Sequence, residues 1–278
     1  MRTLSKLAAA ALGSTLFWVS AVEATHIALP AFTAGSFVVN PSAVVGVPNG
    51  PFVATSMPYN FFAEFDNTAV PATMTGTFVE TASAVFSAFS GVSSGVSGLG
   101  TNYGLYALFS PASGLAQNTA TGVNGTYATF NLNFFVDRNR DTTFTSVGVG
   151  EPNESRGVGT GVSDDVKVLA GALTVGGFHL IDPRAGASDF DVRFLVTGCG
   201  DAAGFFCGPG GLRVGTIGQN AAGLVDPPQG VGPFGAASSA TDIVVTGSGT
   251  IAFQVPEPAS LVLLGIGLAL LGRARRKR

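Results

Sequence analysis

Three oxygen-bearing side chains alternate along one short stretch of this 278-residue chain. Asp137, Asn139 and Asp141 occupy every second position. The spacing Asp-x-Asn-x-Asp places three oxygen ligands on one side of a tight loop, as in calcium loops of the EF-hand type. The sequence therefore predicts a calcium site at these three residues.

The rest of the calcium-loop pattern is incomplete. Thr142 stands where such loops carry glycine, and Gly148 stands where they carry a bidentate glutamate. Four residues further along are candidates for the missing carboxylate: Glu151, Glu154, Asp164 and Asp165. The alternative is an ordinary Asp/Asn turn at the end of a strand, in which Arg138 and Arg140 neutralise the carboxylates.

Groups suited to catalysis are sparse. A Ser-His-Asp triad would have to use His26 or His179, the two histidines of the chain. Closely spaced carboxylates, the groups that glycosidases use, occur as Glu64 with Asp66, Asp164 with Asp165, and Asp189 with Asp191. The alternative is that these carboxylates are ordinary solvated charges on the exposed faces of strands. We therefore expect a protein that is not an enzyme.

The two cysteines flank a short loop that contains glycine. Cys199 and Cys207 lie close enough in sequence to bridge, and a bridge between them would persist in an oxidising compartment, which an exported chain reaches. A zinc site would need more Cys or His ligands than the chain contains. We predict a disulfide between Cys199 and Cys207.

Strands are the elements that must position these residues. Hydrophobic residues alternate in short runs that Gly, Pro and Asn interrupt, as in strands and turns. The clearest strands are expected at 127–136 and 189–196, and residues 241–255 are expected to form a hairpin around Gly247-Ser248-Gly249. Glycine-rich loops are expected at 91–100, 148–161 and 208–235.

The fold class follows from this pattern. The chain contains 22 phenylalanines, enough apolar mass for a packed core, and no long helical pattern precedes the C-terminal segment. The sequence predicts one all-β domain at 25–254, a sandwich or jelly-roll-like body with Gly-rich loops. A β-helix is the alternative, although no fixed repeat supports it.

The N-terminus carries the marks of a signal peptide. Arg2 and Lys6 form a positive region, residues 7–19 an apolar region, and Val22-Glu23-Ala24 a small-residue cleavage site. We therefore expect residues 1–24 to be removed on export.

The C-terminus has three parts. Pro256-Glu257-Pro258 precedes an apolar segment at 259–272, and a basic tail follows at Arg273, Arg275, Arg276, Lys277 and Arg278. A helix over the apolar segment would be about 21 Å long, shorter than a comfortable span of about 20 residues. We expect a transient transmembrane helix, with the basic end held on the cytoplasmic side of the inner membrane. A permanent membrane anchor and a buried core helix are the alternatives.

Between the two expected processing sites the chain is acidic. Seven basic and fifteen acidic residues remain there, for a net charge of −8. Nucleic-acid binding requires clustered Lys and Arg, so we expect no nucleic-acid partner. Divalent cations and neutral or cationic glycans remain compatible with this charge.

The tripartite tail at 255–278 resembles the PEP-CTERM sorting signal of exopolysaccharide-producing Gram-negative bacteria. This resemblance implies recognition by an exosortase-type sorting protease and cleavage near Pro-Glu-Pro. Residues 35–43, 98–109, 134–144 and 164–170 look like the flocculation-associated members of that class. Membership implies an adhesive or structural role in flocculation or in a biofilm matrix, with exopolysaccharide or cell-surface glycans as partners.

The sequence thus leads to one expected function and two alternatives. The expected function is that of an exported protein, transiently anchored in the membrane and then sorted to the cell surface or extracellular matrix. One alternative is a secreted carbohydrate-active hydrolase that acts on the matrix. The other is a surface protein that stays anchored in the membrane.

Overall fold

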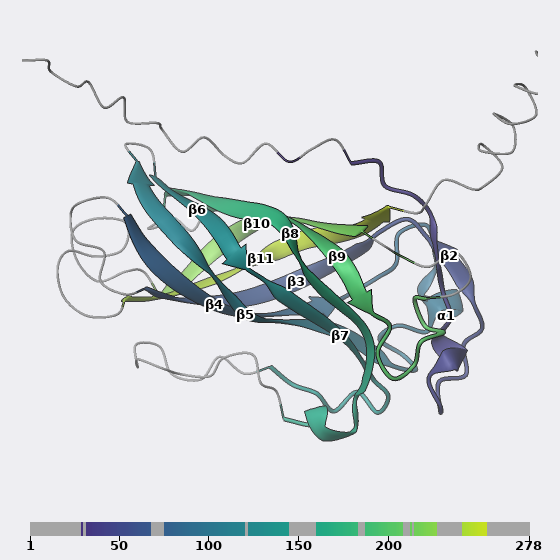
Figure 1. The fold of residues 1–278 in the computed structure, drawn as a ribbon. Helices are drawn as coiled ribbons and strands as arrows, with labels where there is room; N and C mark the ends of the chain where they lie inside the picture. The colour runs from purple at the N-terminus through teal and green to yellow at the C-terminus, as the bar shows by residue number, and fades with distance from the viewer. Residues whose placement is uncertain are drawn as a thin grey trace, which may run out of the picture.

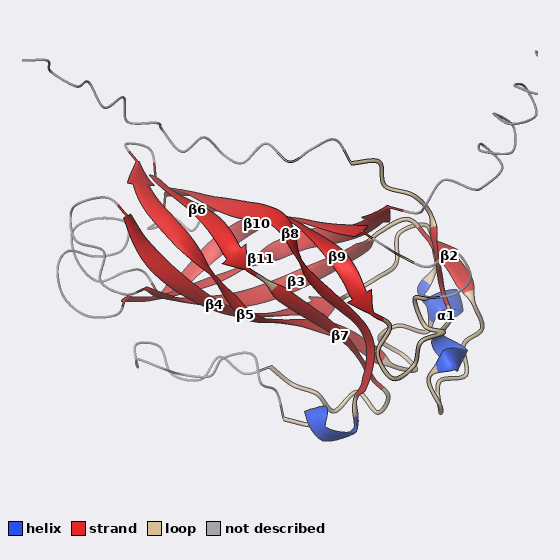
Figure 2. Ribbon diagram, viewed as in Figure 1, coloured by secondary structure: helices blue, strands red, loops and turns tan. Residues whose placement is uncertain are grey.

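A computed structural model describes residues 29, 32–67, 75–119, 122–144, 160–182, 187–207, 212, 214–226 and 241–254. The expected signal peptide at 1–24 and the expected membrane helix at 259–272 lie outside these residues. The described part consists mostly of strands, which confirms the predicted all-β class (Figure 2). None of its helices has the length and apolar character needed to cross a bilayer.

Eleven strands and three short helices make up the described part of the chain. The strands are β1 (Phe37–Val39), β2 (Phe52–Ala54), β3 (Met57–Asn67), β4 (Thr75–Phe86), β5 (Gly104–Thr119), β6 (Gly122–Thr129), β7 (Asn131–Asp137), β8 (Val166–Asp182), β9 (Ala187–Gly198), β10 (Val214–Asp226) and β11 (Thr241–Gln254). The helices are η1 (Pro41–Ala43), α1 (Ser94–Ser97) and η2 (Val162–Asp164).

Nine of the strands form one antiparallel sheet that closes into a ring. The order is β4-β3-β11-β10-β9-β8-β6-β5, and β5 pairs in turn with β4 (Figure 1). β6 and β7 share one place in the ring, because β5 and β8 each pair with β7 along one half and with β6 along the other. β1 and β2 form a separate pair. The strands are thus continuous around the ring, whereas a sandwich has two separate sheets.

The single strand predicted at 127–136 is two strands that meet at Phe130. Phe130 and every second residue after it, up to residue 136, are buried, as their alternation predicts. Tyr127 is buried as well, while Ala128 and Thr129 are both exposed, so the alternation is interrupted at this point. The register of β5 against β6 shifts at the same place. The residue skipped at this shift is Ala128. It interrupts the alternation and so separates β6 from β7.

The predicted hairpin at 241–255 is wrong, because β11 continues through Gly247-Ser248-Gly249 without a turn. Gly249 pairs with Tyr59 of β3. A Cβ atom at Gly249 would lie 2.5 Å from the Tyr59 hydroxyl oxygen, so only glycine leaves room for this ring. Glycine here marks close packing within a strand.

The glycine-rich loop predicted at 208–235 contains a strand, β10. Gly215 of β10 pairs with Phe194 of β9, and a Cβ atom at Gly215 would overlap the Phe194 ring. The same physical reason therefore applies in both strands: an aromatic side chain of the neighbouring strand fills the place of the missing side chain.

Aromatic side chains fill the interior of the closed sheet. Phe253 of β11 contacts the rings of Phe37, Phe134, Phe194 and Phe206, with centroids 5.0 to 6.4 Å apart. All four contacts are tilted or edge-to-face. Such geometry adds about 0.5–1.5 kcal/mol per pair to the burial of the rings. The core therefore joins β1, β7, β9 and β11 to the loop that carries the cysteines.

Candidate functional site

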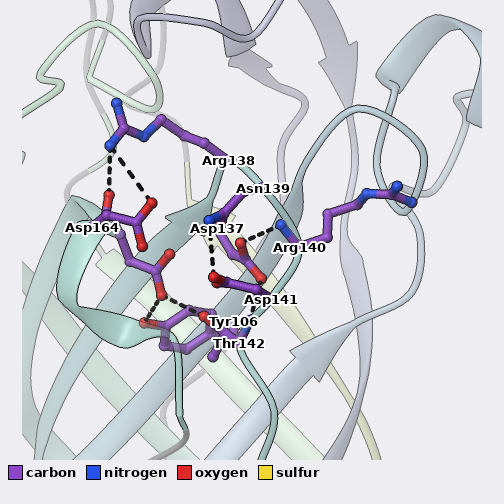
Figure 3. A network of polar contacts seen from close by, with 9 residues as sticks. Tyr106, Asp137, Arg138, Asn139, Arg140, Asp141, Thr142 and Asp164 are labelled. Atoms are coloured by element: carbon purple, nitrogen blue, oxygen red, sulfur yellow. Dashed lines mark hydrogen bonds and ion pairs between the residues drawn. The ribbon is translucent and has the colours of Figure 1, made fainter.

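The turn that follows β7 is anchored by Asp137, whose side chain is only 4% exposed. One carboxylate oxygen accepts a hydrogen bond from the backbone N–H of Arg140 at 2.5 Å (Figure 3). The other accepts from the N–H of Thr142 at 3.0 Å. Arg140 has a φ of 60°, in the left-handed region. The carboxylate therefore holds a strained turn closed through the backbone.

The other two predicted calcium ligands lie on the exposed side of this turn. Asn139 Nδ2 donates to a carboxylate oxygen of Asp141 at 2.9 Å. Gly161 approaches the turn so closely that a Cβ atom there would lie 2.6 Å from the other Asp141 carboxylate oxygen. Thr143 and Thr160 form an isolated bridge beside this contact. The segment before β8 thus returns to the turn after β7.

Both arginines of the turn bind neighbouring loops. Arg138 Nη2 donates to the backbone carbonyl of Asp164 at 2.8 Å and lies 4.0 Å from the Asp164 carboxylate. Arg140 Nη1 donates to the carbonyl of Gly100 at 2.9 Å. Figure 3 shows the two side chains extending in opposite directions from the turn. The arginines therefore tie three loops together.

A second carboxylate, Asp165, completes the network. One of its oxygens accepts hydrogen bonds from the Tyr106 hydroxyl at 2.6 Å and from the Thr142 hydroxyl at 2.7 Å. Burial raises the pKa of Asp165, and the two hydrogen bonds partly offset this effect. Burial and the neighbouring Asp165 both raise the pKa of Tyr106. The sequence indicated Asp165 as a group that could return to the turn, but it gave no signal for Tyr106.

A cavity of about 290 Å3 opens beside this network. Its described lining includes Leu99, Gly100, Tyr106, Arg140 and Phe144. The rings of Tyr106 and Phe144 meet edge to face, with centroids 5.0 Å apart. The cavity thus offers aromatic walls and a guanidinium group to a small ligand.

The three candidate glycosidase pairs lie on different elements. Asp164 and Asp165 lie at the turn, whereas Glu64 and Asp66 belong to β3, and Asp189 and Asp191 to β9. Within the described ranges, no group of three or more His, Cys, Asp or Glu side chains is placed to hold a metal. Asp137 and Asp141 accept hydrogen bonds from protein groups. Glu151 and Glu154 lie outside the described residues, and calcium binding stays a prediction.

Cys199 and Cys207 are joined in a disulfide, with Cα atoms 5.9 Å apart. The loop between them carries Phe205 and Phe206, which are both buried. Phe206 contacts Phe134 and Phe253 in the core, and Phe205 contacts Tyr103. The disulfide therefore closes a loop that plugs one end of the ring.

β11 ends at Gln254, and the Pro-Glu-Pro residues and the basic tail lie beyond the described part of the chain. Comparison with family models finds the PEP-CTERM protein-sorting motif at residues 254–278. No curated protein and no solved structure matches the chain. The motif defines a class of exported proteins that an exosortase-type system processes and sorts to the cell surface. This chain carries that sorting motif directly after the last strand of the ring.

Proposed function

We propose that this protein is a non-enzymatic component of the cell surface or extracellular matrix that helps cells in a polysaccharide coat to hold together. The observation that carries the proposal is the sorting motif at 254–278, which begins where the last strand of the ring ends. The tail inserts transiently in the inner membrane, and an exosortase-type protease cuts it near Pro256-Glu257-Pro258. The ring, which comes before the motif, then remains intact at the surface.

The hydrogen bonds that the carboxylates accept support a structural role for them over a catalytic one. Asp137 accepts two backbone N–H groups, and Asp165 accepts two hydroxyl groups. Asp164 is held near Arg138. A general acid and base must reach the substrate with the lone pair or proton available. These side chains instead fix the shape of the loops.

Settling of liquid cultures tests the proposed role. A deletion strain is complemented with the wild-type gene, with Pro256→Ala plus Glu257→Ala, or with Asp137→Ala plus Asp141→Ala. We expect deletion to disperse the cells and the wild-type gene to restore settling, whereas the sorting variant fails to restore it. The Asp137→Ala plus Asp141→Ala variant shows whether the turn after β7 contributes to settling. Unchanged settling in the deletion strain would refute the adhesive role.

Two further measurements separate the alternatives. The intact mass of the protein recovered from cells shows whether residues 256–278 have been removed, and a retained tail would identify a permanent anchor. Release of reducing sugar from the purified matrix tests for a hydrolase. Glycan turnover that is lost on substitution of Asp165 would replace the present proposal with an enzymatic one.

A further inference from the structure

Exposed apolar side chains gather at the end of the ring where β11 ends. Of the eight large hydrophobic side chains that are exposed among the described residues, five lie there. Val38 of β1 and Val53 of β2 are direct partners in the strand pair, and Val45 lies in the loop between them. Val96 belongs to α1 and Leu195 to β9. Single exposed apolar side chains are normal, whereas a gathering of them marks an interaction surface. These five residues are termed the apolar rim.

The main chain places the apolar rim close to the last residues of β11. The N–H of Gly35, just before β1, donates to the carbonyl of Phe253 at 2.9 Å. Gln254, the last residue of β11, pairs with Val214 of β10, which pairs in turn with Leu195 of β9. Two strand spacings of about 4.8 Å therefore separate Leu195 from Gln254. Figure 1 shows β2 and α1 at the end of the ring toward which β11 points.

The most exposed residue of the rim, Val45, projects from a loop that is held in place. Val45 is 83% exposed, whereas Val44 and Val47 beside it are buried in the core. Further along the loop, Asn49 Nδ2 donates to the carbonyl of Val96 at 3.1 Å, which joins the loop to α1. Apolar side chains on a fixed backbone lose little conformational freedom when a partner covers them.

The segments that carry the four valines of the rim contain no charged residue. Asp, Glu, Lys and Arg are absent from residues 24–63, which include β1, β2 and the loop between them. They are also absent from residues 81–136, which include α1. A surface built from such segments can approach lipid without the cost of removing a charge from water.

The length of chain beyond β11 indicates which partner covers the rim. β11 ends at Gln254, and the apolar segment of the tail begins five residues later, at Ala259. Five residues span at most about 18 Å. A tail inserted in the membrane, as proposed above, holds the end of β11 within that distance of the bilayer. The apolar rim then lies on the part of the ring nearest to the lipid.

We infer that the apolar rim rests on the bilayer surface while the tail is inserted in the membrane. The inference rests on the proposed insertion of the tail, and it adds the surface of the ring that faces the lipid. Pro256-Glu257-Pro258 lies two to four residues beyond β11. Contact at the rim holds this motif at the membrane surface, within reach of a protease embedded in the membrane.

Quenching of tryptophan fluorescence by brominated lipid tests this inference on the full-length chain. Trp18, the single tryptophan of the sequence, is first replaced by Phe, so that each variant carries one tryptophan. Val45→Trp and Leu195→Trp report on the rim, and Leu115→Trp is the control. Each protein is reconstituted in vesicles of phosphatidylethanolamine and phosphatidylglycerol, with and without bromine on the acyl chains.

Leu115 is a matched control because it is exposed on β5 but lies away from the rim. Its neighbour Gly114 pairs with Phe78 of β4, and Phe78 pairs with Asn67 of β3. Asn67 pairs with Thr241, the first residue of β11. The register therefore places Leu115 beside the start of β11, and the length of that strand separates it from the rim.

We expect brominated lipid to quench both rim variants and to leave the control at the emission seen with unbrominated lipid. Val53→Asp, added to the Val45→Trp protein, should remove most of the quenching, because a charge resists transfer from water to lipid. Leu115→Asp, added to the same protein, should leave the quenching unchanged. The three tryptophan variants alone decide the test where Val53→Asp disturbs folding.

Three results would overturn the inference. Equal quenching of the rim variants and the control would show that the ring has no preferred end toward the lipid. Quenching of none would show that the rim stays in water. Emission of the rim variants that shifts to the blue without quenching would show that protein covers the rim, such as a second copy of the chain.

Flotation of the vesicles separates this inference from the proposal on which it rests. Protein that floats with the vesicles, without quenching of the rim variants, keeps the membrane anchor and refutes contact at the rim. Protein that does not float refutes the anchor and the inference together. Cultures that settle normally without the gene, while the rim variants are quenched, refute the adhesive role and leave the rim contact standing.

Discussion

Tyr127 donates its hydroxyl hydrogen bond to the carboxyl group of Glu80 inside the ring. Both side chains are buried, Glu80 with only 2% of its surface exposed. Burial raises the pKa of Glu80 from 4.5 to about 7, and the hydrogen bond from Tyr127 acts in the opposite direction. The interior of the ring therefore contains an acid that favours its neutral form.

This acid predicts a dependence of stability on pH. Because folding raises the pKa of Glu80, its stabilising effect is complete below about pH 4.5 and is lost as the pH rises through about 7. The loss amounts to roughly 3 kcal/mol of unfolding free energy. We expect Glu80→Gln, which stays neutral, to lose this part of the decline. Urea unfolding from about pH 4 to about pH 8 measures it.

Asp201→Asn is the control for this comparison, because Asp201 is exposed. That variant should keep the wild-type decline. A Glu80→Gln protein whose stability falls with pH as steeply as that of the wild type would show that another group is responsible.

Two tyrosines near the site make a matched pair. The Tyr106 hydroxyl donates to Asp165, whereas the buried Tyr103 hydroxyl has no hydrogen-bond partner in the described ranges. We expect Tyr106→Phe to lower the unfolding free energy by about 1–2 kcal/mol, since it leaves Asp165 with one donor fewer. Tyr103→Phe should be neutral or stabilising, because it removes an unsatisfied buried group. Equal losses in the two variants would contradict the assigned role of the hydrogen bond.

The disulfide predicts a redox-dependent stability. Cys199 and Cys207 close a loop with a sequence separation of 8. Cross-linking so short a loop stabilises the folded state by about 2.5 kcal/mol through the entropy of the unfolded chain. We expect Cys199→Ala plus Cys207→Ala to lose about that much in urea unfolding. A reductant should then destabilise the wild type to the same level and leave the double variant unchanged; sensitivity of the variant to reductant would count against this explanation.

Gly249 predicts a steric effect in the middle of a strand. A Cβ atom there would lie 2.5 Å from the Tyr59 hydroxyl oxygen, so Gly249→Ala should cost about 1–3 kcal/mol through overpacking. At Gly198, also in a strand, a new Cβ atom would meet the Ala170 methyl carbon at an ordinary 3.8 Å. Thermal unfolding of the two alanine variants compares them. A Gly198→Ala protein as unstable as Gly249→Ala would point to lost glycine flexibility instead of crowding.

The strands that could be predicted from sequence are those in which alternation is regular. Phe190, Val192 and Phe194 face the core at every second position, and β9 was predicted near its observed bounds. The errors arose at glycines. Gly215 and Gly249 look like turn residues until the aromatic rings of neighbouring strands are placed beside them. Which ring lies opposite depends on register across the sheet, and one sequence does not specify that register.

The site shows the same limit. The spacing of Asp137, Asn139 and Asp141 indicated a tight acidic turn, and the turn exists. Tyr106, from β5, could not be assigned to it because its hydrogen bond to Asp165 links residues 59 positions apart.

The place of β11 in the ring gives the order of synthesis a physical meaning. This last strand lies between β3 and β10, so a chain that stops before residue 241 leaves an unpaired edge on each of them. Open edges of this kind invite aggregation, and their late pairing is slow because β3 is distant in sequence. The sorting motif begins at the residue where β11 ends. Any chain that carries the motif therefore also contains β11, the strand that closes the ring. The sorting system thus acts only on chains that can complete the sheet.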